Sequence, residues 1–169
     1  MTKEFYKLWK RKTKLEEQAI KSLKSARKMI LKNIPNREIF AIYVKGSFIR
    51  REMNQKSDVD MVVIIKENKN IKKVEKVSKK SQNKYNPKVG ISVHSLWELK
   101  KNKHFGKTQK LRAKPDLFIK KVKHYKLIFG EKIAYEKYPS RTDKENLKAR
   151  IKAFKEIFIP FFNASWEDF

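Results

Sequence analysis

The sequence contains no cysteine, which excludes a disulfide framework and any metal site built from thiolates. It also lacks a continuous apolar run of the ~20 residues that a membrane-spanning helix needs. The first residues, Met1 to Lys7, mix charged side chains with apolar ones, unlike the unbroken apolar stretch of a secretory signal. We therefore expect a cytoplasmic protein with no membrane segment.

Acidic residues are scarce as well. The chain has 18 Asp and Glu against 44 Lys and Arg, which gives a formal net charge of +26. The basic residues extend from residue 3 to residue 155 rather than forming one tail. An AT-rich genome would explain many lysines, but not the shortage of acids beside them. Such a surface binds polyphosphates by releasing condensed counterions, so we expect a nucleic-acid partner, with RNA favoured.

Apolar periodicity in the first hundred residues predicts helices and strands. Apolar side chains at three- and four-residue steps predict a helix over residues 3–33. Nearly continuous apolar runs predict buried strands at 38–45 and 58–65, and alternation predicts a third strand at 88–95. A lysine-rich helix is expected at 67–84. With 40% hydrophobic residues, a chain of this length can bury a core.

The rest of the chain is predicted to be mainly helical. Ser95 and Glu98 have the spacing of a capping box that opens a short helix. Longer helices are expected at 117–129, which ends at a glycine, and at 143–159, before an aromatic tail. The elements predict an α/β (α+β) protein with flanking helices and a C-terminal helical segment. We divide the chain into a core, residues 1–100, and a helical extension, residues 101–169.

The segment between the first two strands carries the strongest chemical signal. Gly46 and Ser47 open a short helix over about residues 47–54, where a backbone without side-chain bulk and a hydroxyl can hold phosphate oxygens. The second strand begins with Asp58-Val-Asp60. Alternate residues of a strand share a face, so Asp58 and Asp60 point the same way. Two neighbouring carboxylates favour a divalent cation, and magnesium also accepts phosphate oxygens.

An apolar strand, Gly-Ser, a spacer, Ser-Asp-x-Asp and a second apolar strand together resemble the DNA polymerase beta-like nucleotidyltransferase superfamily, and its small members above all. The resemblance is strongest over residues 38–95. It implies a nucleotidyltransferase-like mixed sheet and a two-metal Mg²⁺ site, with Asp58 and Asp60 as catalytic metal ligands. It implies an NTP as donor, with ATP or CTP expected. The nucleotide-binding residues would be Gly46, Ser47, Arg50 and Ser57.

In that family a third acid on a later strand completes the site and helps to deprotonate the acceptor. It should lie on the face shared by Gly90, Ser92 and His94, where this chain has no carboxylate. We name His94 as a catalytic candidate, because the unperturbed pKa of histidine lies near neutrality. A glutamate from elsewhere is the alternative: Glu52, Glu67 or Glu98.

Three functions are compatible with these features. The first is transfer of a nucleoside monophosphate from an NTP to an acceptor hydroxyl, with an RNA end as the favoured acceptor. The second is a catalytically inactive relative that binds RNA or the ribosome, which the missing acid favours. The third is an antitoxin-type protein adenylyltransferase with a protein partner.

The remaining aromatic and histidine residues are weaker signals. Trp9 and the aromatic tail could stack on bases, whereas Trp97 is expected in the core. His104 and His124 are expected to have no chemical role. The spacing of the three histidines is not that of a zinc site.

Overall fold

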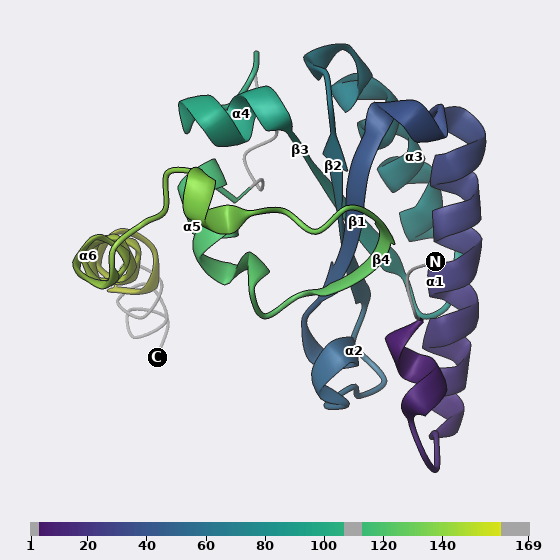
Figure 1. The fold of residues 1–169 in the computed structure, drawn as a ribbon. Helices are drawn as coiled ribbons and strands as arrows, with labels where there is room; N and C mark the ends of the chain where they lie inside the picture. Colours follow the sequence, from purple (N-terminus) through teal and green to yellow (C-terminus); the bar gives the residue numbers. More distant parts are fainter. Residues whose placement is uncertain (1–3, 107–112, 160–169) are drawn as a thin grey trace.

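The computed structural model describes residues 4–106 and 113–159. Its centre is one four-stranded mixed sheet in the order β3-β2-β1-β4 (Figure 1). β1 is antiparallel to both of its neighbours, while β2 and β3 are parallel. This arrangement confirms the predicted fold class. The strands are β1 Ile39–Lys45, β2 Val59–Ile65, β3 Val89–Ser95 and β4 Lys126–Gly130.

Two long helices, α1 Lys14–Asn33 and α3 Ile71–Lys84, cover one face of the sheet (Figure 1). They bury every third or fourth residue against the apolar side chains that β1, β2 and β3 present to this face. The main residues of this layer are Leu23, Ile30, Ile42, Val44, Met61, Val63, Val74, Val77, Ile91 and Val93.

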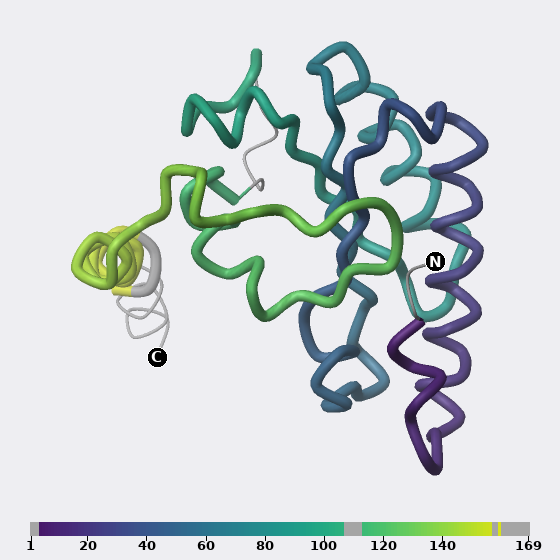
Figure 2. The backbone as a smooth tube through the Cα atoms, viewed as in Figure 1, coloured from purple at the N-terminus to yellow at the C-terminus, as the bar shows by residue number. Residues whose placement is uncertain are grey.

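Shorter helices, α4 Leu96–Lys101 and α5 Pro115–Val122, lie on the opposite side (Figure 1). They contribute Leu99, Phe118, Ile119 and Val122 to a second core layer against Tyr43, Val62 and Ile64. Figure 2 follows the chain from β4 back across this side of the sheet toward α5. That segment is held where the amide of Ile133 donates to the Tyr43 hydroxyl at 2.7 Å.

The strand register places three strand ends at one edge of the sheet. Lys45, the last residue of β1, lies opposite Asp60, and Asp60 lies beside Gly90 of β3. The short helix α2 Ser47–Arg50 connects β1 to the loop that leads into β2. The Gly-Ser turn and the Asp-x-Asp are therefore neighbours in space, although ten residues stand between Ser47 and Asp58 in the sequence.

The predicted helix over residues 3–33 is wrong at its beginning. A 3-10 helix, Phe5–Leu8, is followed by an extended turn, and α1 begins after Thr13. Thr13 and Glu16 form a reciprocal capping box, which stops the helix from extending towards the N-terminus. Trp9 instead packs on Phe48 with ring centroids 5.1 Å apart. α2 is likewise shorter than predicted, because Arg51 adopts a left-handed conformation with φ 60°.

The predicted helix at 117–129 is also wrong, because α5 ends at Val122 and residues 126–130 form β4. This segment pairs with Ala41–Val44 of β1, and pairing to a distant strand overrides a weak local preference for helix. Trp97, expected in the core, is 39% exposed, because it is the second residue of α4 and faces away from the sheet.

The C-terminal helix is close to its predicted position. α6 Asp143–Ala153 continues into a π-helix, Phe154–Phe158, and lies apart from the sheet in Figure 1. The predicted aromatic tail lies outside the described residues. Among residues 4–106 and 113–159, no helix is both long and apolar enough to cross a membrane.

Candidate active site

Gly46 closes the site from the side of β1. Its φ of +82° lies in the region that favours glycine. A Cβ on this residue would stand 2.7 Å from Oδ2 of Asp60, nearer than any real contact allows. Position 46 therefore excludes a side chain for two independent reasons, and the backbone turn and the carboxylate are in direct contact.

Asp58 and Asp60 converge on one point of the sheet. They flank the fully buried Val59, whose amide donates to the carbonyl of Lys88 at 2.8 Å and so begins the parallel pairing of β2 with β3. A Cβ on Gly90 would lie 3.6 Å from Oδ2 of Asp58 and 3.7 Å from Oδ1 of Asp60. The two carboxylates thus meet above a glycine, which leaves the space between them clear of side chains.

The charge balance at Asp60 favours a cation. Burial raises the pKa of Asp60, Lys45 opposes that shift, and the charge of Asp58 adds to it. Lys45 Nζ lies 3.6 Å from Oδ1 of Asp60. The charge of Asp60 also acts on Tyr125. Burial, and to a smaller extent this charge, raise the pKa of the Tyr125 hydroxyl to about 12. A divalent ion beside Asp60 would offset the cost of burying its negative charge, which one lysine does not cancel.

Phe48 anchors the turn that presents Ser47. It is fully buried, and its ring packs edge-on against Phe5 at 6.0 Å and Trp9 at 5.1 Å. The Ser47 carbonyl accepts a hydrogen bond from the amide of Glu52 at 3.0 Å. The predicted base-stacking residue Trp9 is thus part of the support beneath the site.

The other predicted nucleotide-binding residues have partners within the loop. The Ser57 hydroxyl accepts from the amide of Asn54 at 3.0 Å and lies 3.3 Å from its Oδ1, which shapes the turn before Asp58. Arg50 Nε donates to Glu52 at 2.6 Å at an exposed position. Both residues lie at the same end of the sheet as the two aspartates, and their hydrogen bonds are to neighbouring residues of the loop.

From the sequence, Arg51 is expected, together with Arg50, only as a phosphate contact or a solvated residue; in the structure it joins the site to the N-terminal segment. Arg51 donates to both oxygens of Glu16, at 2.8 and 3.1 Å, and its guanidinium lies 5.2 Å from the ring centroid of Trp9. Glu16 is only 4% exposed. The left-handed conformation of Arg51 aims the side chain in this direction, a feature that sequence spacing does not reveal.

The residues named as substitutes for the third acid are dispersed. His94 shares the face of Asp60 but stands four residues beyond Gly90 on β3, about 13 Å along the strand. Glu98 lies past that same far end, and Glu67 follows the far end of β2. Only Glu52 is at the aspartate end. The structure therefore brings Gly90, not His94, beside the aspartate pair.

A pocket of about 140 Å³ extends along the sheet from the aspartates. Lys45, Val62 and Ser92 line it from the strands, and α5 supplies Leu117, Phe118 and Lys121. His94, Ala113 and Tyr125 complete the lining. Because Lys45 also contacts Asp60, the pocket adjoins the carboxylate pair on the side covered by α5.

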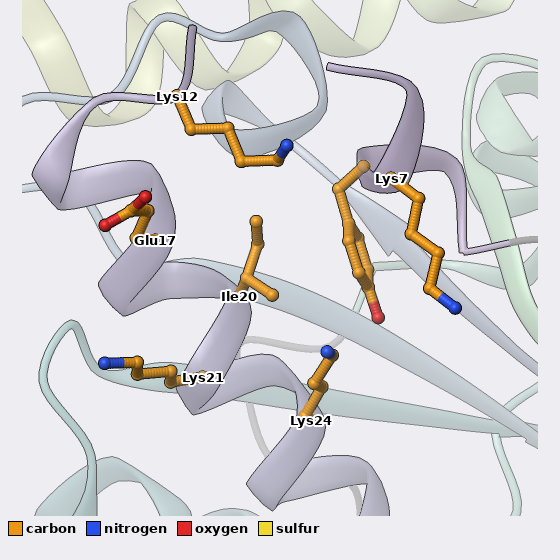
Figure 3. A pocket seen from close by; sticks show the side chains of 7 residues that line it. Lys7, Lys12, Glu17, Ile20, Lys21 and Lys24 are labelled. Atoms are coloured by element: carbon orange, nitrogen blue, oxygen red, sulfur yellow. The ribbon is translucent and has the colours of Figure 1, made fainter. Parts of the chain in front are cut away.

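A larger groove, of about 510 Å³, lies between the N-terminal 3-10 helix and α1 (Figure 3). Lys24 Nζ is 5.7 Å from the ring centroid of the buried Tyr6, and Lys12 Nζ donates to the Trp9 carbonyl at 2.7 Å. The groove has a partly apolar floor and a lysine rim, which suits an anionic polymer better than a metal. Its residues are Tyr6, Lys7, Lys12, Glu17, Ile20, Lys21 and Lys24.

The fold and this edge of the sheet define a protein of the nucleotidyltransferase class. A family model described as polymerase beta, nucleotidyltransferase matches residues 27–132, and the chain belongs to that family. A solved structure from Sulfolobus solfataricus, a candidate nucleotidyltransferase at 1.40 Å resolution, is 22% identical with a TM-score of 0.38; the alignment covers 52% of this chain and 79% of that one. No curated protein matches the chain at a significant level. Membership of the family supports nucleotidyl transfer as the general activity.

Proposed function

We propose that this protein is a magnesium-dependent nucleotidyltransferase that moves a nucleoside monophosphate from an NTP, ATP or CTP, to an acceptor hydroxyl. The observation that carries the proposal is the convergence of Asp58 and Asp60 above Gly90, in contact with Gly46 of the Gly-Ser turn. The acceptor hydroxyl gives up its proton to water and its oxygen forms a bond to the α-phosphorus. The bond between that phosphorus and the oxygen that bridges to the β-phosphorus breaks, and pyrophosphate leaves with that electron pair.

The residues present fit magnesium. Carboxylate oxygens are the ligands that this ion prefers, and burial, with a smaller contribution from Asp58, raises the pKa of Asp60 despite the opposing charge of Lys45. When bound, magnesium would polarise the phosphate and stabilise the charge that develops in the in-line displacement. Asp58 and Asp60 would hold it, because their oxygens face the same point.

The surrounding residues would position the triphosphate. Gly46 keeps the backbone close to Asp60, and the Ser47 hydroxyl is next in the chain. Since α2 has only four residues, its dipole is small, and positive side chains must supply most of the attraction for phosphate. Lys45 would suit this role, because its ammonium group lies beside Asp60 and would be available to a phosphate oxygen.

RNA is the acceptor that we propose. The support is the net charge of +26 together with the lysine-rimmed groove beside the N-terminal helix (Figure 3). Tyr6 lines the groove, and its neighbour Phe5 packs on Phe48, which anchors the Gly-Ser turn. A polyanion in the groove would therefore lie close to the residues that hold this turn in place.

An RNA-binding protein without catalytic activity is the second candidate. The observation in its favour is Gly90, which occupies the place beside Asp60 where the third acid of the family would be expected. A glycine there removes one ligand and one proton acceptor from the site. The two candidates differ in whether the aspartate pair binds nucleotide.

Calorimetric titration with each NTP in Mg²⁺ tests the first candidate. The proteins are the wild type, the Asp58→Ala/Asp60→Ala variant and a Glu131→Ala/Glu136→Ala control, which removes two exposed carboxylates and so matches the change in net charge. Saturable binding by the wild type and the control, but not by the aspartate variant, supports the proposal. Equal binding by all three proteins, or no binding by the wild type, contradicts it and leaves the second candidate.

A further inference from the structure

A second group of possible metal ligands lies at the opposite end of β3 from the aspartate pair. His94, Glu98 and His104 each offer one ligand atom, and these three atoms lie within 4.8 Å of one another. His94 and Glu98 are buried, at 2% and 0% exposure, whereas the side chain of His104 is 19% exposed. The group therefore has a closed interior and one side that an ion can reach.

The donor atoms face one another. Nδ1 of His94 is 3.9 Å from Oε2 of Glu98, and Nδ1 of His104 is 3.7 Å from Oε1 of the same carboxylate. Ligands about 2.0–2.1 Å from a tetrahedral zinc are separated by a little over 3 Å, so small side-chain rotations would bring these atoms into place. Two imidazoles and one carboxylate are a donor set suited to zinc and to other divalent transition metals.

Hydrogen bonds already orient the carboxylate. Oε2 of Glu98 accepts from the Ser95 amide at 3.1 Å, and Oε1 accepts from the Phe105 amide at 2.7 Å. The capping box of α4 thus fixes the side chain that would bridge the two histidines. Such contacts around a ligand raise metal affinity by limiting its motion.

Packing orients the histidine rings as well. The rings of His94 and His104 are stacked, with centroids 6.1 Å apart and planes inclined by 14°. The His94 ring also packs on Phe118 of α5, at 4.9 Å. His104 returns to this position because Asn102, in a left-handed conformation with φ 49°, ends α4 and reverses the chain.

We propose that His94, Glu98 and His104 bind one divalent transition metal ion, with zinc the best suited. The ion would join the end of β3 to the start of α4 and to the segment that follows α4. Its place is independent of Asp58 and Asp60, because His94 is four residues farther along β3 than the glycine beside Asp60. Three protein ligands leave a fourth position for water.

The same geometry could instead hold a proton, as an imidazolium paired with the buried carboxylate. A metal site predicts stoichiometric metal binding, a visible spectrum of bound cobalt and a higher melting temperature with zinc. A protonated pair predicts none of these. His124, the third histidine of the chain, is exposed at the end of α5 and provides a matched control.

The test uses chelator-treated protein titrated with Co²⁺ and Zn²⁺. All variants are made in the Asp58→Ala/Asp60→Ala background as well, so that metal at the aspartates is not counted. We expect one equivalent of Co²⁺ with visible ligand-field bands, displacement by Zn²⁺, and a higher melting temperature with zinc. His104→Ala, at a partly exposed position, removes a direct ligand and should weaken Zn²⁺ affinity by at least the ~100-fold that loss of an outer-shell partner can cost, while His124→Ala should not. Absence of stoichiometric binding by the wild type, or equal affinity in both histidine variants, would overturn the proposal.

Discussion

Gly46 and Asp60 are in such close contact that the carboxylate occupies the space of a side chain at position 46. We expect Gly46→Ala to lower the free energy of unfolding by about 2–4 kcal/mol, because left-handed strain of about 1–2 kcal/mol adds to a steric overlap. It should also abolish magnesium-dependent nucleotide binding, since Asp60 must move. Chemical denaturation and calorimetry measure the two effects.

Gly106 provides the control for that substitution. Its φ is +70°, but a Cβ there would meet nothing within 4 Å. Gly106→Ala should therefore cost only the conformational part, about 1–2 kcal/mol, and leave nucleotide binding intact. If the two variants lose the same stability, the contact with Asp60 is not what restricts position 46.

The raised pKa of Asp60 predicts a pH-dependent stability. A folded protein that holds this proton more tightly than the unfolded chain loses stability as pH rises from 3.8, the ordinary value, through the raised pKa. Asp60→Asn removes the charge, so without magnesium it should be more stable than the wild type at pH 7.5. The advantage should shrink as pH falls towards 4. Urea denaturation at both pH values measures it.

Asp143 supplies a control of the opposite sign. Lys120 lowers the pKa of this exposed carboxylate, so Asp143→Asn should bring no gain at pH 7.5. Magnesium should stabilise the wild type and the Asp143 variant but not Asp60→Asn. An Asp60→Asn protein that is less stable than the wild type at neutral pH would show that Lys45 outweighs burial and the charge of Asp58.

Gly90 is the position at which a third carboxylate can be restored. The backbone there is outside the left-handed region, and a Cβ would have ordinary contacts of 3.6 and 3.7 Å to the two aspartates. Without magnesium, Gly90→Asp should lower stability by about 1–2 kcal/mol through like-charge repulsion. With magnesium, affinity for the ion should rise about tenfold, equivalent to about 1.4 kcal/mol, and transfer should be faster.

Gly90→Asn separates charge from size, because it has the same shape without the negative charge. It should leave magnesium affinity within about twofold of the wild type. Calorimetry with Mg²⁺ and denaturation with and without the ion make the comparison. If Gly90→Asp and Gly90→Asn bind magnesium equally well, the space above Gly90 is not part of a metal site.

Arg51 and Arg50 are adjacent but should differ widely in their contribution to stability. Arg51→Ala leaves the buried Glu16 carboxylate without its bidentate partner, and we expect a loss of about 2–4 kcal/mol. Arg50→Ala removes an exposed pair with Glu52 and should change stability by less than about 0.5 kcal/mol. Urea denaturation at neutral pH decides; similar losses in the two variants would contradict a structural role specific to Arg51.

Local patterns predicted the elements that carry the site. The apolar runs of β1 and β2, and the alternation that places Asp58 and Asp60 on one face, depend on neighbours in the sequence. The capping box of Ser95 and Glu98 was predictable for the same reason and is present. Such signals arise from backbone geometry within a few residues, so a single sequence contains them.

The start of α1 at the Thr13–Glu16 capping box is a local feature, whereas the other main errors come from contacts between distant residues. β4 forms because Ala41–Val44 offers a pairing edge, and no pattern within residues 126–130 encodes that partner. Alternation placed His94 on the correct face, but the β2–β3 register decides its distance along the strand. The grouping of His94 with His104 depends on the reversal at Asn102, which sequence spacing does not show.

The lysine-rimmed groove predicts where RNA binds. Lys7, Lys21 and Lys24 are exposed on its rim, and replacing all three by alanine should reduce the slope of log affinity against log salt by about 2, since each phosphate contact on a single strand contributes about 0.7. The control is Lys72→Ala/Lys73→Ala/Lys76→Ala on the exposed face of α3, which removes the same charge elsewhere. Fluorescence anisotropy with a short single-stranded RNA at several salt concentrations measures both slopes. If the slope falls equally in the two variants, RNA affinity depends on the total charge of the protein, and the groove is not a specific RNA-binding surface.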